Sequence, residues 1–157
     1  MAYRRKSWLE KLNDDKGLPK VVEITEKMSR KWGAGMCVVP SPREVDEIMK
    51  RVPRGKLTTI NEIRSALARK HHATIGCPIT TGIFASIAAH AAAEEGEKGN
   101  TDTTPYWRTL KSGGVINEKY PGGMEEQRRL LESEGHQVDQ RGRKTVVLDF
   151  EKSLAKV

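Results

Sequence analysis

Apolar residues repeat three and four positions apart in the first half of the chain, and this spacing predicts helices. One stretch follows Ser41, which can cap a helix with proline in the first helical position and Glu44 reaching back to the cap amide. Residues 53–56 should end that helix. Thr59 opens a second capping pattern, so another helix should continue to about residue 70. The inward positions are Val45, Ile48, Met49 and Val52 in the first helix and Ile60, Ile63 and Leu67 in the second.

A third helix is predicted from a threonine cap, at Thr80 or Thr81, to residues 94–96. Gly76 and Pro78 shape the connection before it, so the second and third helices form a helix-turn-helix candidate. The apolar positions that should share the inner face of the third helix are Ile83, Phe84, Ile87, Ala88 and Ala91.

The pattern becomes shorter and more polar further along the chain. Residues 96–104 have the composition of a surface loop, and residues 107–116 predict a short hairpin. A helix should span residues 124–133, and weak alternation over residues 137–147 predicts a second small hairpin. We therefore expect a mainly α fold with short β-hairpins.

The length of the chain, 157 residues, suits one domain with a small appendage. Residues 1–36 are highly charged and carry only weak amphipathic signals, so we expect an N-terminal arm or short helices there. The folded domain should then span residues 37–157.

The charge of the chain is unevenly distributed. In total, 28 Lys and Arg against 21 Asp and Glu give a net charge of +7. Residues 1–70 carry 17 basic and 9 acidic side chains, so the excess lies there. Such a field favours a polyanionic partner such as double-stranded DNA, although a solvated basic face without a ligand has the same composition. No apolar run is long enough to span a membrane, so we expect a cytoplasmic protein without a membrane partner.

The two cysteines, Cys37 and Cys77, stand 40 positions apart without a CxxC pair. This spacing predicts free thiols in a reducing compartment. Together with His71 and His72 they match no zinc-site template. We expect neither a metal nor another cofactor.

Three short motifs follow one another in the second half of the chain: Pro105-Tyr106-Trp107-Arg108, Tyr120-Pro121-Gly122-Gly123 and Glu134-Gly135-His136. In this order and spacing they resemble the DNA-binding domain of O6-alkylguanine-DNA alkyltransferases, a resemblance that extends over about residues 40–136. It implies a winged helix-turn-helix fold for residues 37–157. In that family the first motif reads Pro-Cys-His-Arg. Tyr106 therefore stands in place of the reactive cysteine, and Trp107 in place of the histidine that takes its proton.

Loss of the thiolate predicts a DNA-binding protein that is not an enzyme, because a tyrosine hydroxyl with a pKa of about 10 is almost wholly protonated near neutral pH. The chain is similar to alkyltransferase-like proteins, which bind alkylated guanine and recruit nucleotide-excision-repair proteins. This resemblance implies a lesion pocket made of Pro105, Tyr106, Trp107, Tyr120, Gly122 and Glu134. The alternative is a buried aromatic pair that only fills the volume of the lost active site.

The third predicted helix is slim and uncharged between Thr80 and Ala93. The resemblance implies that it docks in the minor groove, where groove width matters more than a base code, whereas an Ala-rich helix is also typical of a core. Ile60 and Gly82 align with the tyrosine and the base-flipping arginine of the family. The predicted DNA contacts are Lys56, Thr59, Arg69, Thr80, Thr81, Gly82, Ser86 and Arg108. Arg108 has a second interpretation, as a pin for the turn before it.

Two other functions compete with this interpretation. The first is an active alkyltransferase whose nucleophile has moved to Cys77, which lies just before a helix N-terminus where the dipole can lower the pKa of a thiol. The second is a winged-helix regulator. A regulator normally presents Arg, Asn or Gln on its reading helix, and residues 80–93 contain none of them.

Overall fold

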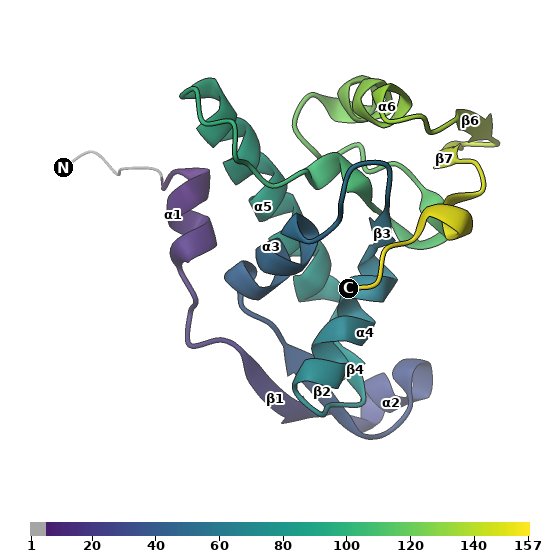
Figure 1. Ribbon diagram of the computed structural model, residues 1–157. Helices are drawn as coiled ribbons and strands as arrows, with labels where there is room; N and C mark the ends of the chain where they lie inside the picture. The colour runs from purple at the N-terminus through teal and green to yellow at the C-terminus, as the bar shows by residue number, and fades with distance from the viewer. Residues whose placement is uncertain (1–5) are drawn as a thin grey trace.

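The long helix α5 (Pro78–Glu97) is the centre of the fold, which the computed structural model describes over residues 6–157. Helices α1 (Trp8–Asn13), α3 (Pro42–Lys50) and α4 (Ile60–Lys70) pack against it (Figure 1). The inner face of α5 is rich in buried alanines, and their small side chains let the neighbouring helices approach closely.

The capping signals predicted for α3 and α4 are confirmed. The Ser41 side chain accepts the Glu44 amide at 3.3 Å, and the Glu44 carboxylate accepts the Ser41 amide at 3.2 Å, which completes a capping box. Thr59 caps α4 by accepting the amide of Glu62 at 3.2 Å. Both helices therefore begin where the sequence places them.

Helix α5 begins earlier than predicted, with Cys77 as its N-cap and Pro78 in the first helical position. Proline suits that position because it has no amide hydrogen to leave unpaired there. Thr81, one of the two predicted caps, lies inside the first turn, where its hydroxyl donates to the Cys77 carbonyl at 2.6 Å. The prediction that Ile83 faces the core is also wrong, since its side chain is 51% exposed.

An N-terminal arm or short helices were expected before residue 37. The described residues of this segment form two short helices and also a strand that was not predicted. Helix α2 (Glu26–Trp32) follows β1 (Lys20–Glu23), which pairs antiparallel with β2 (Met36–Val39). Strand β2 also pairs parallel with β4 (Ile75–Gly76). Every residue of β1 is exposed, so its sequence lacks the alternation that marks a half-buried strand. The division between residues 36 and 37 stays a prediction, although this sheet spans it.

The hairpin predicted for residues 107–116 is wrong in its pairing. Strand β5 (Thr109–Leu110) instead pairs parallel with β3 (Thr58–Thr59). Only the bridge between Lys111 and Val115 is antiparallel, around the short helix η2 (Ser112–Gly114). The sequence showed the turn glycines but could not show which distant strand β5 would meet.

The predicted helix and hairpin at the end of the chain are both confirmed. Helix α6 (Gly123–Ser133) precedes the antiparallel strands β6 (Val138–Arg141) and β7 (Lys144–Val147). The chain then forms η3 (Phe150–Ser153) and returns to the start of β3, where Leu57 bridges to Leu154. The last residues therefore lie beside the middle of the chain (Figure 1).

Two hydrophobic clusters hold the fold together. The larger one joins α1, α3, α4 and α5 and includes Tyr106 and Tyr120. The smaller one lies under α6 and the β6–β7 hairpin and consists of Leu57, Leu110, Ile116, Leu131 and Val147. Trp107 packs against both clusters, so the motif at residues 105–108 lies at their junction.

Candidate nucleic-acid interface

The motif at the junction is a short 3-10 helix, η1 (Tyr106–Arg108), fixed by one carboxylate. Arg108 Nε donates to Glu134 Oε1 at 2.9 Å, and Nη2 donates to Oε2 at 2.8 Å. The Trp107 indole N–H donates to the same carboxylate at 2.9 Å, and the Gly55 amide at 3.2 Å. Arg108 Nη1 also donates to the Val52 carbonyl at 2.8 Å. The Arg108 and Glu134 side chains are 14% and 4% exposed, so Arg108 acts as a pin for this turn.

The electrostatics of this network follow from its geometry. Burial raises the pKa of Glu134, but hydrogen bonds from Arg108, Trp107 and the Gly55 amide oppose it and leave the pKa below its usual value. Glu134 is therefore ionised near neutral pH and holds α6, η1 and the turn at Gly55 together.

The aromatic side chains of the predicted lesion pocket pack on one another. The Tyr106 ring lies edge to face with Trp107, at 5.4 Å between centroids, and with Tyr120, at 5.7 Å. Tyr106 and Tyr120 are both buried, and burial raises the pKa of each hydroxyl. The space that the resemblance assigns to a base is thus occupied by these rings, which fits the packing alternative.

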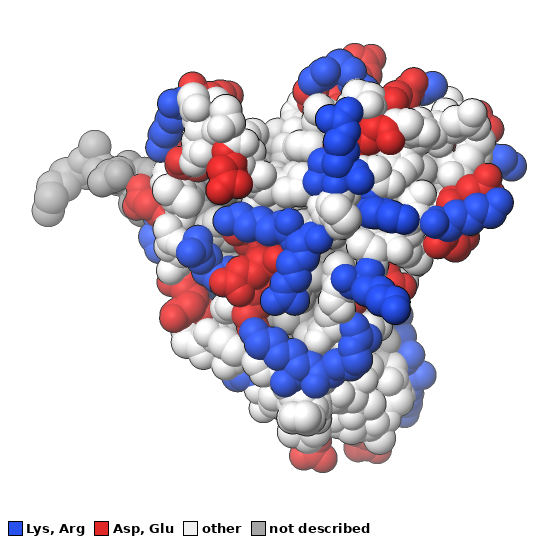
Figure 2. Space-filling view, in the orientation of Figure 1, with Lys and Arg blue, Asp and Glu red and all other residues white. Residues whose placement is uncertain are grey.

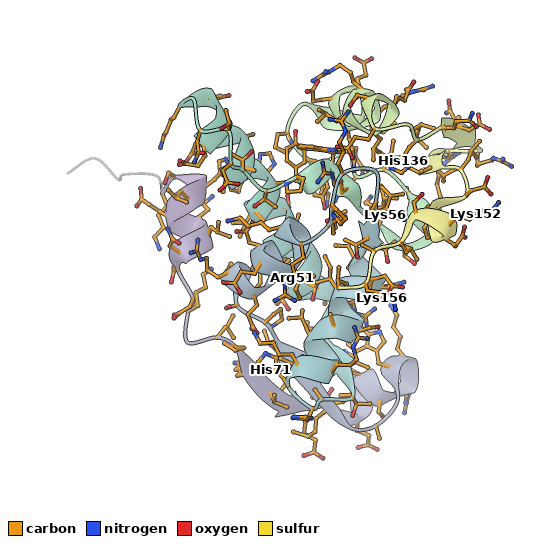
Figure 3. All side chains as sticks on the ribbon, in the orientation of Figure 1. Arg51, Lys56, His71, His136, Lys152 and Lys156 are labelled. Carbon is orange, nitrogen blue, oxygen red and sulfur yellow. The ribbon has the colours of Figure 1, made fainter. Side chains whose placement is uncertain are left out.

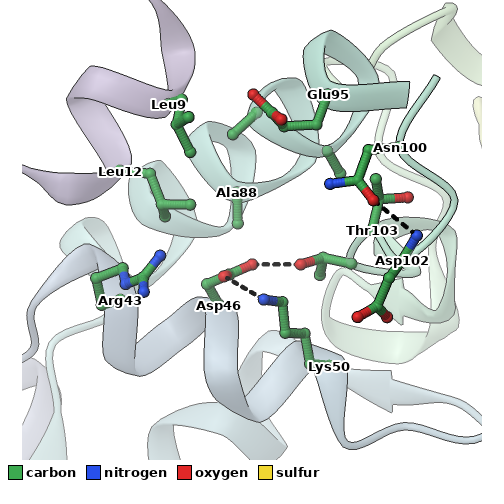
Figure 4. Close-up of a pocket in the computed structure, with 13 residues that line it drawn as sticks. Leu9, Leu12, Arg43, Asp46, Lys50, Ala88, Glu95, Asn100, Asp102 and Thr103 are labelled. Carbon is green, nitrogen blue, oxygen red and sulfur yellow. Dashed lines mark hydrogen bonds and ion pairs between the residues drawn. The ribbon is translucent and has the colours of Figure 1, made fainter. Parts of the chain in front are cut away.

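The remaining predicted pocket residues shape the backbone around these rings. Pro105 caps η1, and Gly122 caps α6 with a φ of 80°, a conformation that favours glycine. Just before Pro105, the Thr104 hydroxyl donates to the buried carboxylate of Asp46 at 2.6 Å (Figure 4). This bond ties the loop to α3 beside a hollow of about 160 Å³ between α1, α3 and α5.

A larger groove of about 450 Å³ runs along the outer side of α5. Its floor is a stripe of α5 formed by Ile79, Gly82, Ile83 and Ser86, which lie on one side of the helix. Ile79 and Ile83 are 61% and 51% exposed and are the two most exposed large apolar side chains among residues 6–157. We call this surface the α5 groove. Its other lining residues are Trp8, Ile60, Ile87, Lys111, Asn117 and Lys119.

Trp8 closes one end of the α5 groove. Its indole stacks on the His90 ring at 4.4 Å between centroids, and the Lys11 ammonium lies over the indole at 4.1 Å. His90 Nε2 lies 2.9 Å from the Lys119 carbonyl oxygen. A helix outside the region of resemblance therefore contributes an aromatic wall.

A second hollow continues from the groove toward the β6–β7 hairpin. Lys111 lines both hollows, and Arg143 and Lys144 of the hairpin line the second. We call the β6–β7 hairpin the wing. The groove and the wing therefore adjoin at Lys111, whose ammonium is paired with the Glu118 carboxylate at 3.1 Å, and cationic side chains lie on both sides of this pair.

Arg108, one of the eight predicted DNA contacts, is 14% exposed and paired with Glu134, and the structure separates the other seven into three groups. Gly82 and Ser86 line the α5 groove, and so does Ile60. Thr59, Thr80 and Thr81 have hydroxyls that face the protein, since Thr59 and Thr81 bond within their own helices and the Thr80 hydroxyl is buried. Lys56 and Arg69 are exposed but do not line the groove. The sequence analysis missed two groove residues, Ile79 and Lys119. Ile79 belongs to the exposed stripe of α5, which the sequence analysis did not find because it placed Ile83 in the core.

The two cysteines are further candidate reactive groups in the described part of the chain. Burial raises the pKa of the Cys37 thiol, and the neighbouring Cys77 raises it further. Both thiols are free, and neither cysteine lines the α5 groove. Within residues 6–157, no three His, Cys, Asp or Glu side chains gather as metal ligands would. No helix in this described part of the chain is both long and apolar enough to cross a membrane.

Comparison with known proteins supports the fold. No protein-family model matches the sequence, and no curated protein matches it either. Among solved structures, S. pombe Atl1 in complex with damaged DNA containing O6-carboxymethylguanine matches with a TM-score of 0.52 and 23% identity. S. pombe ATL in complex with DNA matches with a TM-score of 0.53 and 20% identity. Each match covers 74% of this chain and 94% of the other. The chain therefore has the fold of the alkyltransferase-like protein Atl1, including its winged helix-turn-helix.

Proposed function

We propose that this protein binds double-stranded DNA through the α5 groove and does not catalyse alkyl transfer. The observation that carries the proposal is the exposed stripe of α5, which is apolar, slim and uncharged in a chain of net charge +7. A helix without charged or amide side chains has little to offer the major-groove base code. It suits the minor groove, where proteins read groove width and press apolar side chains against the base pairs.

Cationic side chains beside the stripe supply the phosphate contacts in this proposal. Lys111 and Lys119 line the groove itself, and Arg143 and Lys144 lie on the wing. Such contacts set the orientation of the protein without reading sequence. Binding should therefore depend on salt and show little preference between unrelated sequences.

The absence of catalysis rests on position 106. Burial raises the pKa of the Tyr106 hydroxyl, so a phenolate nucleophile is even scarcer than in water. The rival nucleophile Cys77 does not line the groove, and burial raises the pKa of the thiol of its neighbour Cys37. Burial keeps the Cys37 thiol protonated, unlike the low-pKa thiols of reactive cysteines.

We further propose that the protein senses alkylated guanine and acts through repair partners such as nucleotide-excision-repair proteins. Support comes from the shared fold and from the damaged DNA in the Atl1 complex. The contacts of Tyr106 with Trp107 and Tyr120 mean that a base can enter only if these rings move. An extruded base would then stack on them, and each such stack contributes about 1–3 kcal/mol.

A titration with four proteins tests where DNA binds. The wild type, Ile83→Glu, Ile79→Glu and the control Val21→Glu are titrated with matched duplexes, one normal and one with O6-methylguanine, at two salt concentrations. Val21 is an exposed apolar residue of β1, so its replacement adds the same charge away from the groove. We expect both α5 variants to lose affinity at least tenfold while the control stays within twofold of wild type. Equal affinities for all four proteins would refute the placement.

A further inference from the structure

Four cationic side chains lie together on one face of the molecule without a carboxylate partner in residues 6–157. They are Arg51 at the end of α3, Lys56 in the turn before β3, and Lys152 and Lys156 near the end of the chain (Figure 3). The backbone explains why they meet, because Leu57 N donates to Ser153 O at 2.9 Å and Ala155 N to Leu57 O at 2.8 Å. Figure 2 shows Lys and Arg side chains across the middle of this face, with a smaller group of Asp and Glu side chains beside them. We call these four residues the basic face.

Neighbouring residues extend the basic face. Arg51, Arg69 and Lys70 line a shared hollow of about 480 Å³, which Glu44, Glu47 and Val157 also line. Arg69 Nη2 donates to the Val157 carbonyl at 3.1 Å. Lys70 is paired with the buried Glu44 carboxylate at 2.7 Å. Cations that are clustered and unpaired repel one another, which costs free energy unless a polyanion neutralises them.

The basic face and the α5 groove lie on opposite sides of the helical layer. On α5, the stripe containing Ile79 and Ile83 is half a turn away from Ala88 and Ala92. Helix α3 covers that inner side, where Asp46 and Lys50 line a hollow with Ala88 and Ala92 (Figure 1). Arg51 follows α3 on its outer side. None of the four residues of the basic face lines the α5 groove or the hollow that adjoins it, so a duplex in the groove leaves the basic face uncovered.

The composition of the basic face distinguishes between classes of partner. Protein interfaces centre on buried apolar or aromatic anchors. The large exposed apolar residues of the described structure are Val21, Val22, Met36, Ile79, Ile83 and Met124, and none of them lines the hollow at Arg51 and Arg69. Surfaces that bind the nucleic-acid backbone are instead polar and strongly cationic.

We propose that the basic face is a second DNA-binding surface, which holds the phosphate backbone of another duplex segment while the first lies in the α5 groove. One molecule of the protein then bridges two segments. With three or four phosphates neutralised, the log-log salt slope of this second site is about −3 to −4.

The test is a bridging assay with one immobilised duplex and a second, fluorescent duplex at about 50 mM salt, where phosphate contacts are strong. Four proteins are compared. The wild type and the single variant Ile83→Glu are the first two. The third is a basic-face triple variant that combines Lys56→Gln, Lys152→Gln and Lys156→Gln, and the fourth is a charge-matched control triple variant that combines Lys20→Gln, Lys27→Gln and Arg30→Gln. The control residues are exposed and lie on β1 and α2, away from both surfaces. Binding to a single duplex is measured for each protein at two salt concentrations.

We expect wild type and control to retain the fluorescent duplex and the basic-face triple variant to retain at least tenfold less while still binding one duplex. Ile83→Glu should bridge poorly but keep salt-sensitive binding through the basic face. Bridging by a monomer should decline when protein exceeds DNA, since each duplex then carries its own protein.

Three results would overturn the proposal. The first is equal bridging by the two triple variants, and the second is bridging that persists in protein excess, which indicates a protein dimer. The third is loss of all DNA binding in Ile83→Glu with an unchanged fold, which leaves the α5 groove as the single site. If the triple variant loses single-duplex binding while Ile83→Glu keeps it, the basic face is instead the primary site, and the proposed α5 interface fails separately.

Discussion

Replacement of Glu134 by alanine should destabilise the protein strongly. The carboxylate accepts hydrogen bonds from the Arg108 guanidinium, the Trp107 indole and the Gly55 amide. Its removal leaves a cation that is 14% exposed without its partner, and it also strands two neutral donors. Breaking one partner of a buried pair costs about 3–5 kcal/mol.

The expected effect on melting temperature follows from the size of the chain. For 150–250 residues, 1 kcal/mol shifts Tm by about 2–4 °C, so Glu134→Ala should lower Tm by about 6–20 °C. The measurement is thermal and urea unfolding followed by circular dichroism. Glu134→Gln serves as the matched control, because an amide oxygen still accepts one or two of the hydrogen bonds and should recover part of the loss. A destabilisation below about 1 kcal/mol would refute the reasoning, since surface ion pairs already contribute that much.

Three further predictions follow from the same geometry. The pKa values of Glu44 and Glu134 are lowered in the folded state, so the unfolded chain binds more protons in acid. The stability that these two carboxylates contribute is therefore complete above the unfolded-state pKa of about 4.3 and is lost as the pH falls through their folded-state pKa values. Urea unfolding midpoints measured from neutral to acid pH should show this loss, and the loss should be smaller in Glu134→Gln. Tyr106→Ala should erase any preference for O6-methylguanine duplex while leaving salt-dependent affinity nearly intact, with Tyr106→Phe as the control; an equal fall on both duplexes in a folded variant would mean that Tyr106 only packs. Excess protein incubated with methylated duplex should gain no methyl group by mass spectrometry, and an adduct at Cys37 or Cys77 would contradict the non-enzymatic proposal.

The local signals of this sequence predicted the local structure well. Capping at Ser41 and Thr59 depends on neighbours within three residues, so the starts of α3 and α4 could be read directly. The β6–β7 hairpin likewise depends on a turn at Gly142, which has a positive φ of 63°. Structure that depends on residues close together in the chain can therefore be predicted from the sequence.

Pairings between distant segments could not be predicted in the same way. Strand β5 has only two residues, and its parallel partner β3 lies about fifty positions earlier. Strand β1 has no buried position to produce alternation. Nothing in either segment specifies its partner, because backbone hydrogen bonding in a short strand is nearly independent of side chain.

Some residues that line the α5 groove were singled out from the sequence and others were not. The motifs led to predicted DNA contacts at Gly82 and Ser86, and both residues line the α5 groove, as does Ile60. That DNA binds there stays a prediction. The assumption that an isoleucine in an alanine-rich helix faces the core concealed the exposed position of Ile83. Hydrophobicity alone cannot distinguish a core side chain from one that contacts a partner.

The position of the exposed isoleucines also bears on how the protein would select its DNA. Apolar side chains that press against a groove contribute the most binding free energy where base pairs are easily unstacked. This is because the cost of deforming DNA depends on its sequence and on its lesions. The cations at Lys111, Lys119 and the wing would hold any duplex equally. Selectivity would then come from deformability sensed at Ile79 and Ile83. A damaged or mismatched base pair, which is cheaper to unstack, would be bound more tightly even before a base reaches Tyr106.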